Sequence, residues 1–132
     1  MYMKTNNYES IEHVDDETVV NAMREGFLFL MKVEEGDGMS WNSTMSDLIE
    51  LCHAMWLEGL AVDGLGQPLT FTSLLHRMCE VLHMTMPRNH TAVVNNIRRR
   101  KSPCLSLQFR CKVMMACYHV KHPIERMVTR SP

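Results

Sequence analysis

The sequence predicts a mainly helical protein, a bundle of about five helices with at most a very short β-hairpin. The chain has 132 residues, which is enough for one domain with a substantial core and too short for two. Apolar residues recur at helical spacing in several segments, whereas no run of strand length alternates between apolar and polar residues. The 13 methionines also favour a helical core, because the flexible Met side chain fills irregular gaps.

The first helix is expected from residue 15 to about residue 34. It opens with three acidic residues, which suit the positive end of a helix dipole, and it stops before the Gly-Asp-Gly stretch at 36–38. Because the residues from 26 onward are almost continuously apolar, this helix either packs inside the domain or forms a homodimer contact. The apolar residues that recur at helical spacing are Val19, Val20, Met23, Phe27, Leu30 and Met31.

The second and third helices are separated by a turn. The second is expected after Ser43, whose hydroxyl can cap it. Its apolar face consists of Leu48, Ile49, Cys52, Met55, Trp56 and Leu60. The Gly-rich residues 62–68 indicate a turn that can join two very short extended pieces. The third helix, capped by Thr70 or Thr72, is expected to end near residue 83, and its inner residues are Leu74, Leu75, Met78, Cys79 and Leu82.

The last two helices are expected at 89–101 and from residue 102 to about residue 118. The fourth helix buries a narrow seam formed by Val93, Val94 and Ile97. The fifth opens with Ser-Pro, and proline is tolerated in the first turn of a helix. Its expected inner residues are Leu105, Phe109, Val113, Met114 and Cys117.

These elements predict a division of the chain into three parts. Residues 1–38 form an N-terminal extension with one helix, and residues 39–122 form the domain. The His-Pro pair at 122–123 is expected to end the ordered part, so residues 123–132 are predicted to be a disordered tail.

Charge is distributed very unevenly along the chain. Residues 1–80 carry 14 acidic and 4 basic side chains, whereas residues 81–132 carry 1 acidic and 10 basic side chains. The net charge of -1 therefore conceals a charge of -10 in the first part and +9 in the second. Such a split indicates either an electropositive face for a polyanion or two halves that neutralise each other across an interface.

The basic fourth helix is typical of a DNA-recognition helix. A break near Pro87 separates it from the preceding helix, as in the helix-turn-helix plan, where the second helix enters the major groove of duplex DNA. The face opposite its apolar seam is polar and basic. Asn can pair with an adenine edge, and Arg can pair with a guanine edge or a phosphate. The residues predicted to contact DNA are Arg88, Asn95, Asn96, Arg98, Arg99, Arg100, Lys101, Arg110 and Lys112.

The basic run at 98–101 also has a purely structural interpretation. The dipole of a helix favours cations at its C-terminal end, so this run is either a solvated terminus or a partner for the acidic first half. A second alternative is a protein-interaction module of the same fold that does not bind DNA and that uses residues 27–31 or a Met-rich surface. The acidic N-terminal segment can also mask the basic helix.

Four stretches of the chain form a distinctive set: Trp-Asn-Ser at 41–43, Asp-Leu-Ile-Glu-Leu-Cys-His-Ala at 47–54, Glu-Gly at 58–59 and Ile-Arg-Arg-Arg-Lys at 97–101. Together they resemble the C-terminal domain of the RteC family, regulators encoded on conjugative transposons. The resemblance covers residues 41–118, about three-fifths of the chain. It departs from the family at Ser-Pro-Cys, residues 102–104, where the family has a polar linker, and at residues 1–38, which replace a separate N-terminal domain.

This resemblance implies a winged-helix-like DNA-binding domain that acts in the transcriptional regulation of mobile genetic elements. It carries over Arg98, Arg100 and Lys101 as basic positions of the recognition region. It also carries over four core positions, namely Trp41, Leu48, Ile49 and Ala54.

The sequence does not favour an enzyme or a metalloprotein. His76, Cys79, Glu80 and His83 lie at helical spacings and can be drawn as a zinc site, but Cys79 also completes the inner face of its helix. No nucleophile elbow surrounds any Ser or Cys, and the chain has no Gly-rich phosphate loop. We therefore expect no catalytic residues, no metal and no cofactor.

Cysteine usage and hydropathy predict a cytoplasmic protein. The five cysteines form no Cys-x-x-Cys pair and are odd in number, so we interpret them as reduced core residues. The longest apolar run, residues 26–31, is far shorter than the roughly 20 residues that span a bilayer. We therefore expect no membrane segment.

Overall fold

The computed structural model describes residues 11, 13–100 and 106–131. This part of the chain is mainly helical, as predicted, and its strands form one short antiparallel pair. The α-helices are α2 (Asp16–Met31), α3 (Met45–Leu57), α4 (Phe71–Val81), α5 (His90–Arg98) and α6 (Leu107–Cys117). The remaining elements are the 3₁₀ helices η1 (Glu35–Asp37) and η3 (Glu125–Met127) and the strands β1 (Met39–Trp41) and β2 (Val128–Arg130).

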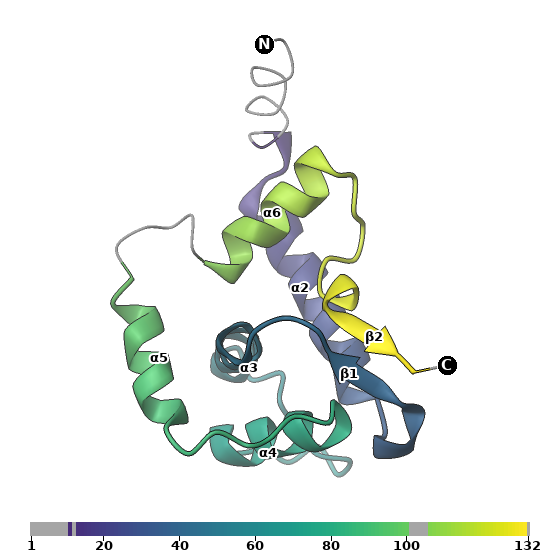
Figure 1. Ribbon diagram of the computed structural model, residues 1–132. Coiled ribbons are helices and arrows are strands. Elements are labelled where there is room, and N and C mark those ends of the chain that lie inside the picture. Colours follow the sequence, from purple (N-terminus) through teal and green to yellow (C-terminus); the bar gives the residue numbers. More distant parts are fainter. Residues whose placement is uncertain (1–10, 12, 101–105, 132) are drawn as a thin grey trace.

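Helix α3 is the centre of the fold. It packs against α2, α4, α5 and α6, and α2 also packs against α6. In Figure 1, α3 is seen nearly end-on, with α5 on the left, α4 below, and α2 and α6 above and to the right. Helix α5 packs chiefly against α3 and therefore stands at the periphery of the bundle.

Side-chain caps explain where four of these helices begin. Asp15 accepts a hydrogen bond from the backbone N–H of Thr18 at the start of α2, and Thr70 caps α4 as one of the two predicted residues. Ser106 caps α6 in the same way. The expectation that Ser43 caps the second helix is wrong. Thr44 caps α3, because its hydroxyl accepts from the N–H of Asp47, and the Ser43 hydroxyl instead donates to the Asp47 carboxylate.

The apolar faces predicted for α2, α3 and α4 form a single hydrophobic core. Two residues of α2, Phe27 and Leu30, have no exposed surface, so α2 packs inside the domain. Residues 27–31 therefore do not offer a free apolar surface to a partner protein. Leu28 is the large apolar residue of that stretch that points outward, and it is 43% exposed. All five inner residues predicted for α4 are buried.

The inner face predicted for the last helix is wrong. Helix α6 begins at Leu107, and its buried residues are Leu107, Cys111 and Ala116. Phe109, Val113, Met114 and Cys117 are only partly buried, and Leu105 and the predicted start at 102–103 lie outside the described residues. Apolar residues surround α6 on all sides, so hydrophobic periodicity could not define which side faces the core.

The predicted disordered tail is also wrong. Strand β2 pairs antiparallel with β1, with Trp41 opposite Val128, and Ile124 is completely buried. Ile124 packs against Gly26 of α2 so closely that a Cβ atom at Gly26 would lie 2.4 Å from the Cβ atom of Ile124. The C-terminal segment is therefore part of the same core as α2.

A candidate nucleic-acid interface on helix α5

Helix α5 buries its predicted seam and exposes its opposite face. Val94 is buried, and Val93 and Ile97 are partly buried against the core. The helix ends where the backbone N–H of Arg99 bonds to carbonyl groups of the preceding turn. A nine-residue helix with one apolar seam leaves most of its circumference available to solvent.

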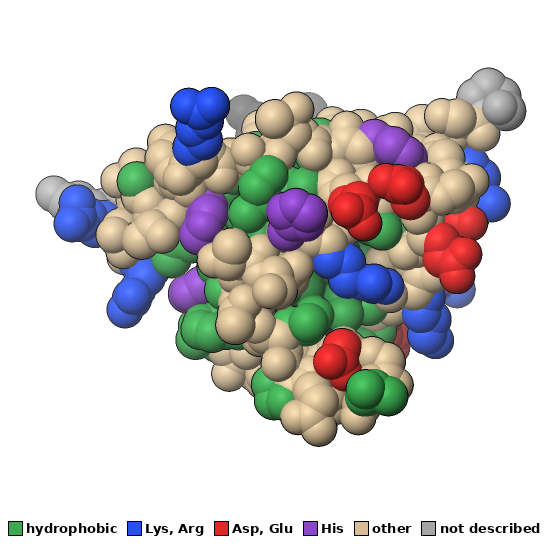
Figure 2. Space-filling view, turned by 90° about the horizontal axis from the view of Figure 1, so that it is seen from below, with side chains coloured by type: hydrophobic (Ala, Val, Ile, Leu, Met, Phe, Trp, Pro, Cys, Tyr) green, Lys and Arg blue, Asp and Glu red, His purple; other side chains and the backbone are tan. Residues whose placement is uncertain are grey.

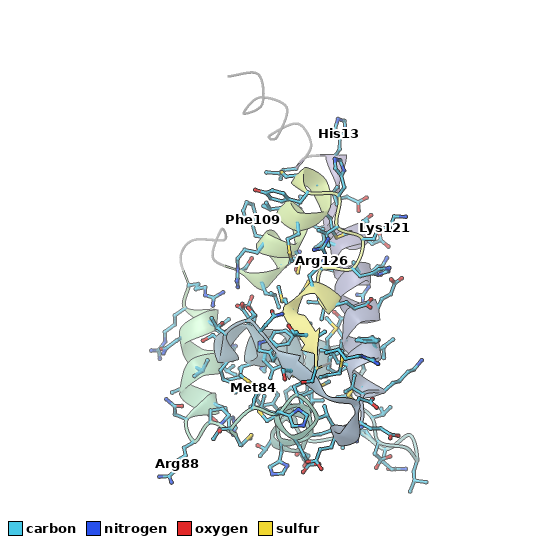
Figure 3. All side chains as sticks on the ribbon, turned by 45° about the vertical axis from the view of Figure 1, so that its right-hand side comes forward. His13, Met84, Arg88, Phe109, Lys121 and Arg126 are labelled. Carbon is cyan, nitrogen blue, oxygen red and sulfur yellow. The ribbon has the colours of Figure 1, made fainter. Side chains whose placement is uncertain are left out.

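The exposed surface of α5, together with Arg88 before the helix and Arg99 after it, carries arginine and asparagine side chains. We call this surface the α5 outer face, and it consists of Arg88, Asn95, Asn96, Arg98 and Arg99, all of which are exposed. Figure 3 shows Arg88 pointing away from the body of the molecule. Within the described part of the chain, none of these three arginines forms an ion pair.

The surroundings of α5 contain little negative charge. Figure 2, which views the molecule from below, shows Lys, Arg and His side chains on the left, where α5 lies in Figure 1. The acidic side chains visible on this face are gathered toward the right. Residues 81–124 contain no Asp or Glu at all. The α5 outer face is therefore an electropositive region of the surface.

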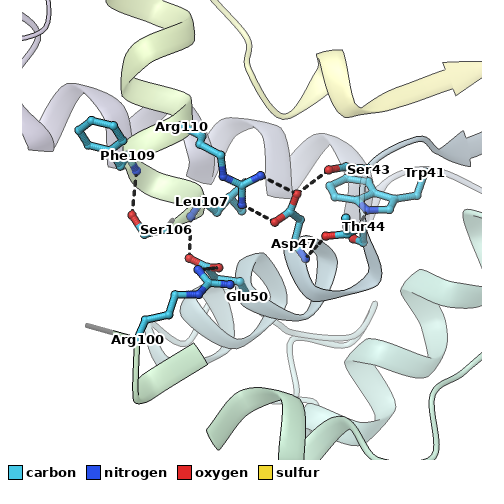
Figure 4. Close-up of polar contacts among 10 residues, drawn as sticks. All are labelled: Trp41, Ser43, Thr44, Asp47, Glu50, Arg100, Ser106, Leu107, Phe109 and Arg110. Atoms are coloured by element: carbon cyan, nitrogen blue, oxygen red, sulfur yellow. Dashed lines mark hydrogen bonds and ion pairs between the residues drawn. The ribbon is translucent and has the colours of Figure 1, made fainter. Parts of the chain in front are cut away.

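Arg100, one of the predicted DNA contacts, is instead directed toward α3. Its guanidinium donates to one carboxylate oxygen of Glu50 at 2.7 Å, and both side chains are largely buried. The second carboxylate oxygen of Glu50 accepts the backbone N–H of Leu107 at 2.8 Å. One carboxylate thus holds the end of α5 and the start of α6 against α3, as Figure 4 shows. This contact also joins the 47–54 and 97–101 stretches that carry the family resemblance.

Arg110, a second predicted DNA contact, pairs with a buried carboxylate. Its two terminal nitrogens donate to the two oxygens of Asp47, one of them at 2.9 Å. Asp47 is 2% exposed. Burial by itself would raise the pKa of Asp47, but the hydrogen bonds from Arg110 and Ser43 outweigh burial and hold the pKa below its usual range. Asp47 is therefore a charged residue inside the fold.

Lys112, on the same helix, pairs with Asp16 of α2 at 3.2 Å. Each of these three ion pairs joins an acidic residue from the first 80 residues to a basic residue from the last 52. The charge asymmetry of the sequence therefore has two outcomes. Some of the basic residues neutralise the acidic half, and the α5 outer face stays exposed. Lys101 lies outside the described residues.

A groove between α3 and α5 was not anticipated from the sequence. We call it the α3/α5 groove; it has a volume of about 460 Å³. Its lining includes His53, Trp56, Leu57, Val94, Ile97 and Arg98. Burial lowers the pKa of His53, and the nearby positive charge of Arg98 lowers it further. Only the joint placement of α3 and α5 creates this groove, so periodicity within one helix gives no sign of it.

The four residues that could be combined into a zinc site, His76, Cys79, Glu80 and His83, do not converge on one point. Cys79 is buried in the core, whereas His76 and Glu80 are exposed on the other side of the helix. In the residues that the structure describes, no group of three or more His, Cys, Asp or Glu side chains could hold a metal ion. Burial raises the pKa of the Cys111 thiol to about 12, and Cys52 and Cys79 are buried as well.

None of the described helices combines the length and the apolar character needed to cross a membrane.

No family model, curated protein or solved structure matches this chain.

Proposed function

We propose that this protein is a DNA-binding domain that contacts duplex DNA through the α5 outer face. The observation that carries the proposal is the contrast among the basic residues. Arg100, Arg110 and Lys112 are occupied by carboxylates of α2 and α3, whereas the arginines of the α5 outer face have no carboxylate partner among the described residues. Unneutralised cations beside exposed amide side chains suit a polyanion that also presents base edges.

The dimensions of α5 support this proposal. An α-helix with its side chains is about 10–12 Å in diameter and fits the major groove of B-DNA, which is about 12 Å wide, and the nine residues of α5 extend roughly 13 Å along the helix axis. Arg88 lies before the start of α5, and Arg98 and Arg99 lie at its end. Cations at both ends of a helix in the groove can reach phosphates of both strands, while Asn95 and Asn96 between them can reach base edges.

The resemblance to the RteC family extends this proposal to transcriptional regulation of genes on mobile elements. In this proposal α5 acts as the recognition helix and is held chiefly against α3, whereas α4 is joined to it through residues 82–89. The ion pair between Arg100 and Glu50 positions α5, so Arg100 supports the interface without touching DNA.

The proposal is tested by measuring duplex binding as a function of salt concentration. Binding of the full chain to a fluorescent duplex of mixed sequence is followed by anisotropy for wild type, Arg88→Gln, Arg99→Gln and Arg126→Gln. Arg126 is an exposed arginine of η3, away from α5 in Figure 3, and is the matched control. Loss of one phosphate contact should reduce the slope of log K against log salt by about one unit in each α5 variant.

The control variant should keep the wild-type slope. Equal slopes for wild type and both α5 variants would contradict the proposal, and so would an equal loss in Arg126→Gln. Asn95→Ala and Asn96→Ala should leave the salt slope unchanged and alter the ranking of duplexes of different sequence, because base contacts specify sequence.

A further inference from the structure

The α3/α5 groove has the dimensions of a small-molecule site. Its volume of about 460 Å³ lies in the range of roughly 300–1,000 Å³ that is usual for ligand pockets. A second hollow of about 230 Å³ adjoins it and shares His53, Trp56, Val94 and Arg98 with it. One wall comes from α3 and the other from the inner side of α5. The lining of the groove itself includes neither asparagine of the α5 outer face, whereas Asn95 lines the smaller hollow.

The walls of the groove are apolar and held in place. The Trp56 indole N–H donates to the backbone carbonyl of Leu69 at 3.0 Å, and the Trp56 ring packs against Phe71. The ring is thus fixed by contacts outside the groove and presents apolar surface to it. Leu57, at the edge of the groove, is 67% exposed and extends the apolar wall toward solvent. A ligand that covers Leu57 gains hydrophobic stabilisation.

The groove also carries one uncompensated positive charge. Glu50 lies at its border, but the charge of Glu50 is neutralised by Arg100. Arg98 lines both hollows and forms no ion pair with a described residue. An occupant with an apolar body and a single negative group would satisfy both the walls and this guanidinium.

We propose that the α3/α5 groove binds a small aromatic anion, with its rings between Trp56 and Ile97 and its carboxylate or sulfonate on the Arg98 guanidinium. This binding does not depend on the proposed function. A consequence does depend on it: because Arg98 also belongs to the α5 outer face, a ligand in the groove would remove one cation from the DNA interface and weaken DNA binding.

The test uses two dyes that differ in charge. 1-Anilinonaphthalene-8-sulfonate and N-phenyl-1-naphthylamine share the same aromatic body, but only the first carries an anionic group. Each dye is titrated into the folded full chain at pH 7 without DNA, and binding is followed by dye fluorescence. The sulfonate dye should bind more tightly. Arg98→Gln should weaken its binding about tenfold and should change binding of the neutral dye less than twofold.

Two further variants serve as controls. Arg99→Gln removes the adjacent arginine, which does not line the groove, and it should leave binding of both dyes unchanged. Ala54→Leu adds a larger side chain to the groove wall and should weaken both dyes. Circular dichroism verifies that each variant is folded. In wild type, amide shifts in a ¹⁵N NMR titration should be largest around Val94 and Ile97, which locates the dye without any substitution.

The inference would be overturned by no binding of the sulfonate dye, by equal effects of Arg98→Gln on both dyes, or by amide shifts that lie away from the groove. Equal binding of the two dyes, insensitive to Arg98, would indicate a general apolar docking surface and would also overturn it. Because no DNA is present, failure of this inference is distinguishable from failure of the DNA-binding proposal.

Discussion

Replacing Arg110 by Met should destabilise the fold more than neutralising its partner Asp47. The two members of this ion pair differ in their access to water, because the Arg110 side chain is 41% exposed and the Asp47 side chain is 3% exposed. Without Asp47, Arg110 can turn into solvent. Without Arg110, the carboxylate stays buried and keeps the Ser43 hydroxyl as its side-chain donor.

The expected magnitudes follow from this asymmetry. Breaking a buried ion pair by removing one member costs about 3–5 kcal/mol, and partial exposure of Arg110 places Arg110→Met near the lower value, about 3 kcal/mol. Asp47→Asn keeps the shape of the side chain and can still bond to Ser43, so its cost should be about 1 kcal/mol. The Met side chain retains much of the aliphatic stem of Arg110, which limits loss of packing.

Urea denaturation at pH 7, followed by circular dichroism, gives the free energy of unfolding for each variant. Arg126→Met is the matched control, because it makes the same replacement at an exposed arginine and should change stability by less than about 0.5 kcal/mol. A cost of Arg110→Met no larger than that of this control, or a cost of Asp47→Asn larger than that of Arg110→Met, would contradict the proposed asymmetry of the ion pair.

Three further predictions concern acid stability and the C-terminal segment. The pKa of Asp47 is lowered in the fold, so the stability that its charge contributes is present above the ordinary pKa of 3.8 and is lost as the pH falls below 3.8 toward the folded-state pKa. In Asp47→Asn, the free energy of unfolding measured against pH should therefore fall less in acid than it does in wild type. Gly26→Ala places a methyl group 2.4 Å from the Ile124 Cβ atom and should cost about 1–3 kcal/mol in urea denaturation, whereas an unchanged midpoint would contradict that close contact. Deleting residues 123–132 removes the buried side chains of Ile124 and Met127 and should lower stability by roughly 3 kcal/mol or more; a deletion with wild-type stability would mean that this segment contributes nothing to the core.

The elements that sequence patterns predicted well are those with a single apolar side. Helix α4 has all its buried residues on one face and a threonine cap directly before it, so both its position and its orientation could be read from local spacing. Helix α6 has apolar residues all around, so local spacing predicted where it ends but neither where it begins nor which side faces the core. Only the packing of α6 against α2 and α3 decides that Cys111 is buried and Met114 is partly exposed.

The C-terminal segment depends on contacts between distant parts of the chain. Strand β2 has three residues, too few for a recognisable alternation, and it forms only because β1 lies beside it. Ile124 requires a glycine at position 26 to come close to α2. Neither partner can be identified from the residues around the other.

Sequence patterns predicted which residues of α5 are exposed, but they did not predict which basic residues form ion pairs. The spacing of Val94 and Ile97 correctly placed Asn95 and Arg99 on the exposed side of α5. A list of charges does not say which cation lies opposite which carboxylate, so the pairing of Arg100 with Glu50 required the three-dimensional arrangement. Both interpretations of the charge asymmetry therefore apply to part of the chain. Arg100 neutralises an acidic residue of the first half, whereas Arg99 lies on an exposed electropositive surface.

DNA binding through the α5 outer face is tested most directly by a ¹⁵N NMR titration of the full chain with a DNA duplex at low salt. The amide shifts should concentrate at residues 88–99, and the amides of α2, on the opposite side of α3 in Figure 1, should stay near their free positions. Perturbations centred on α2 or on the C-terminal strand, or no perturbation at any duplex concentration, would contradict the claim that the α5 outer face binds DNA.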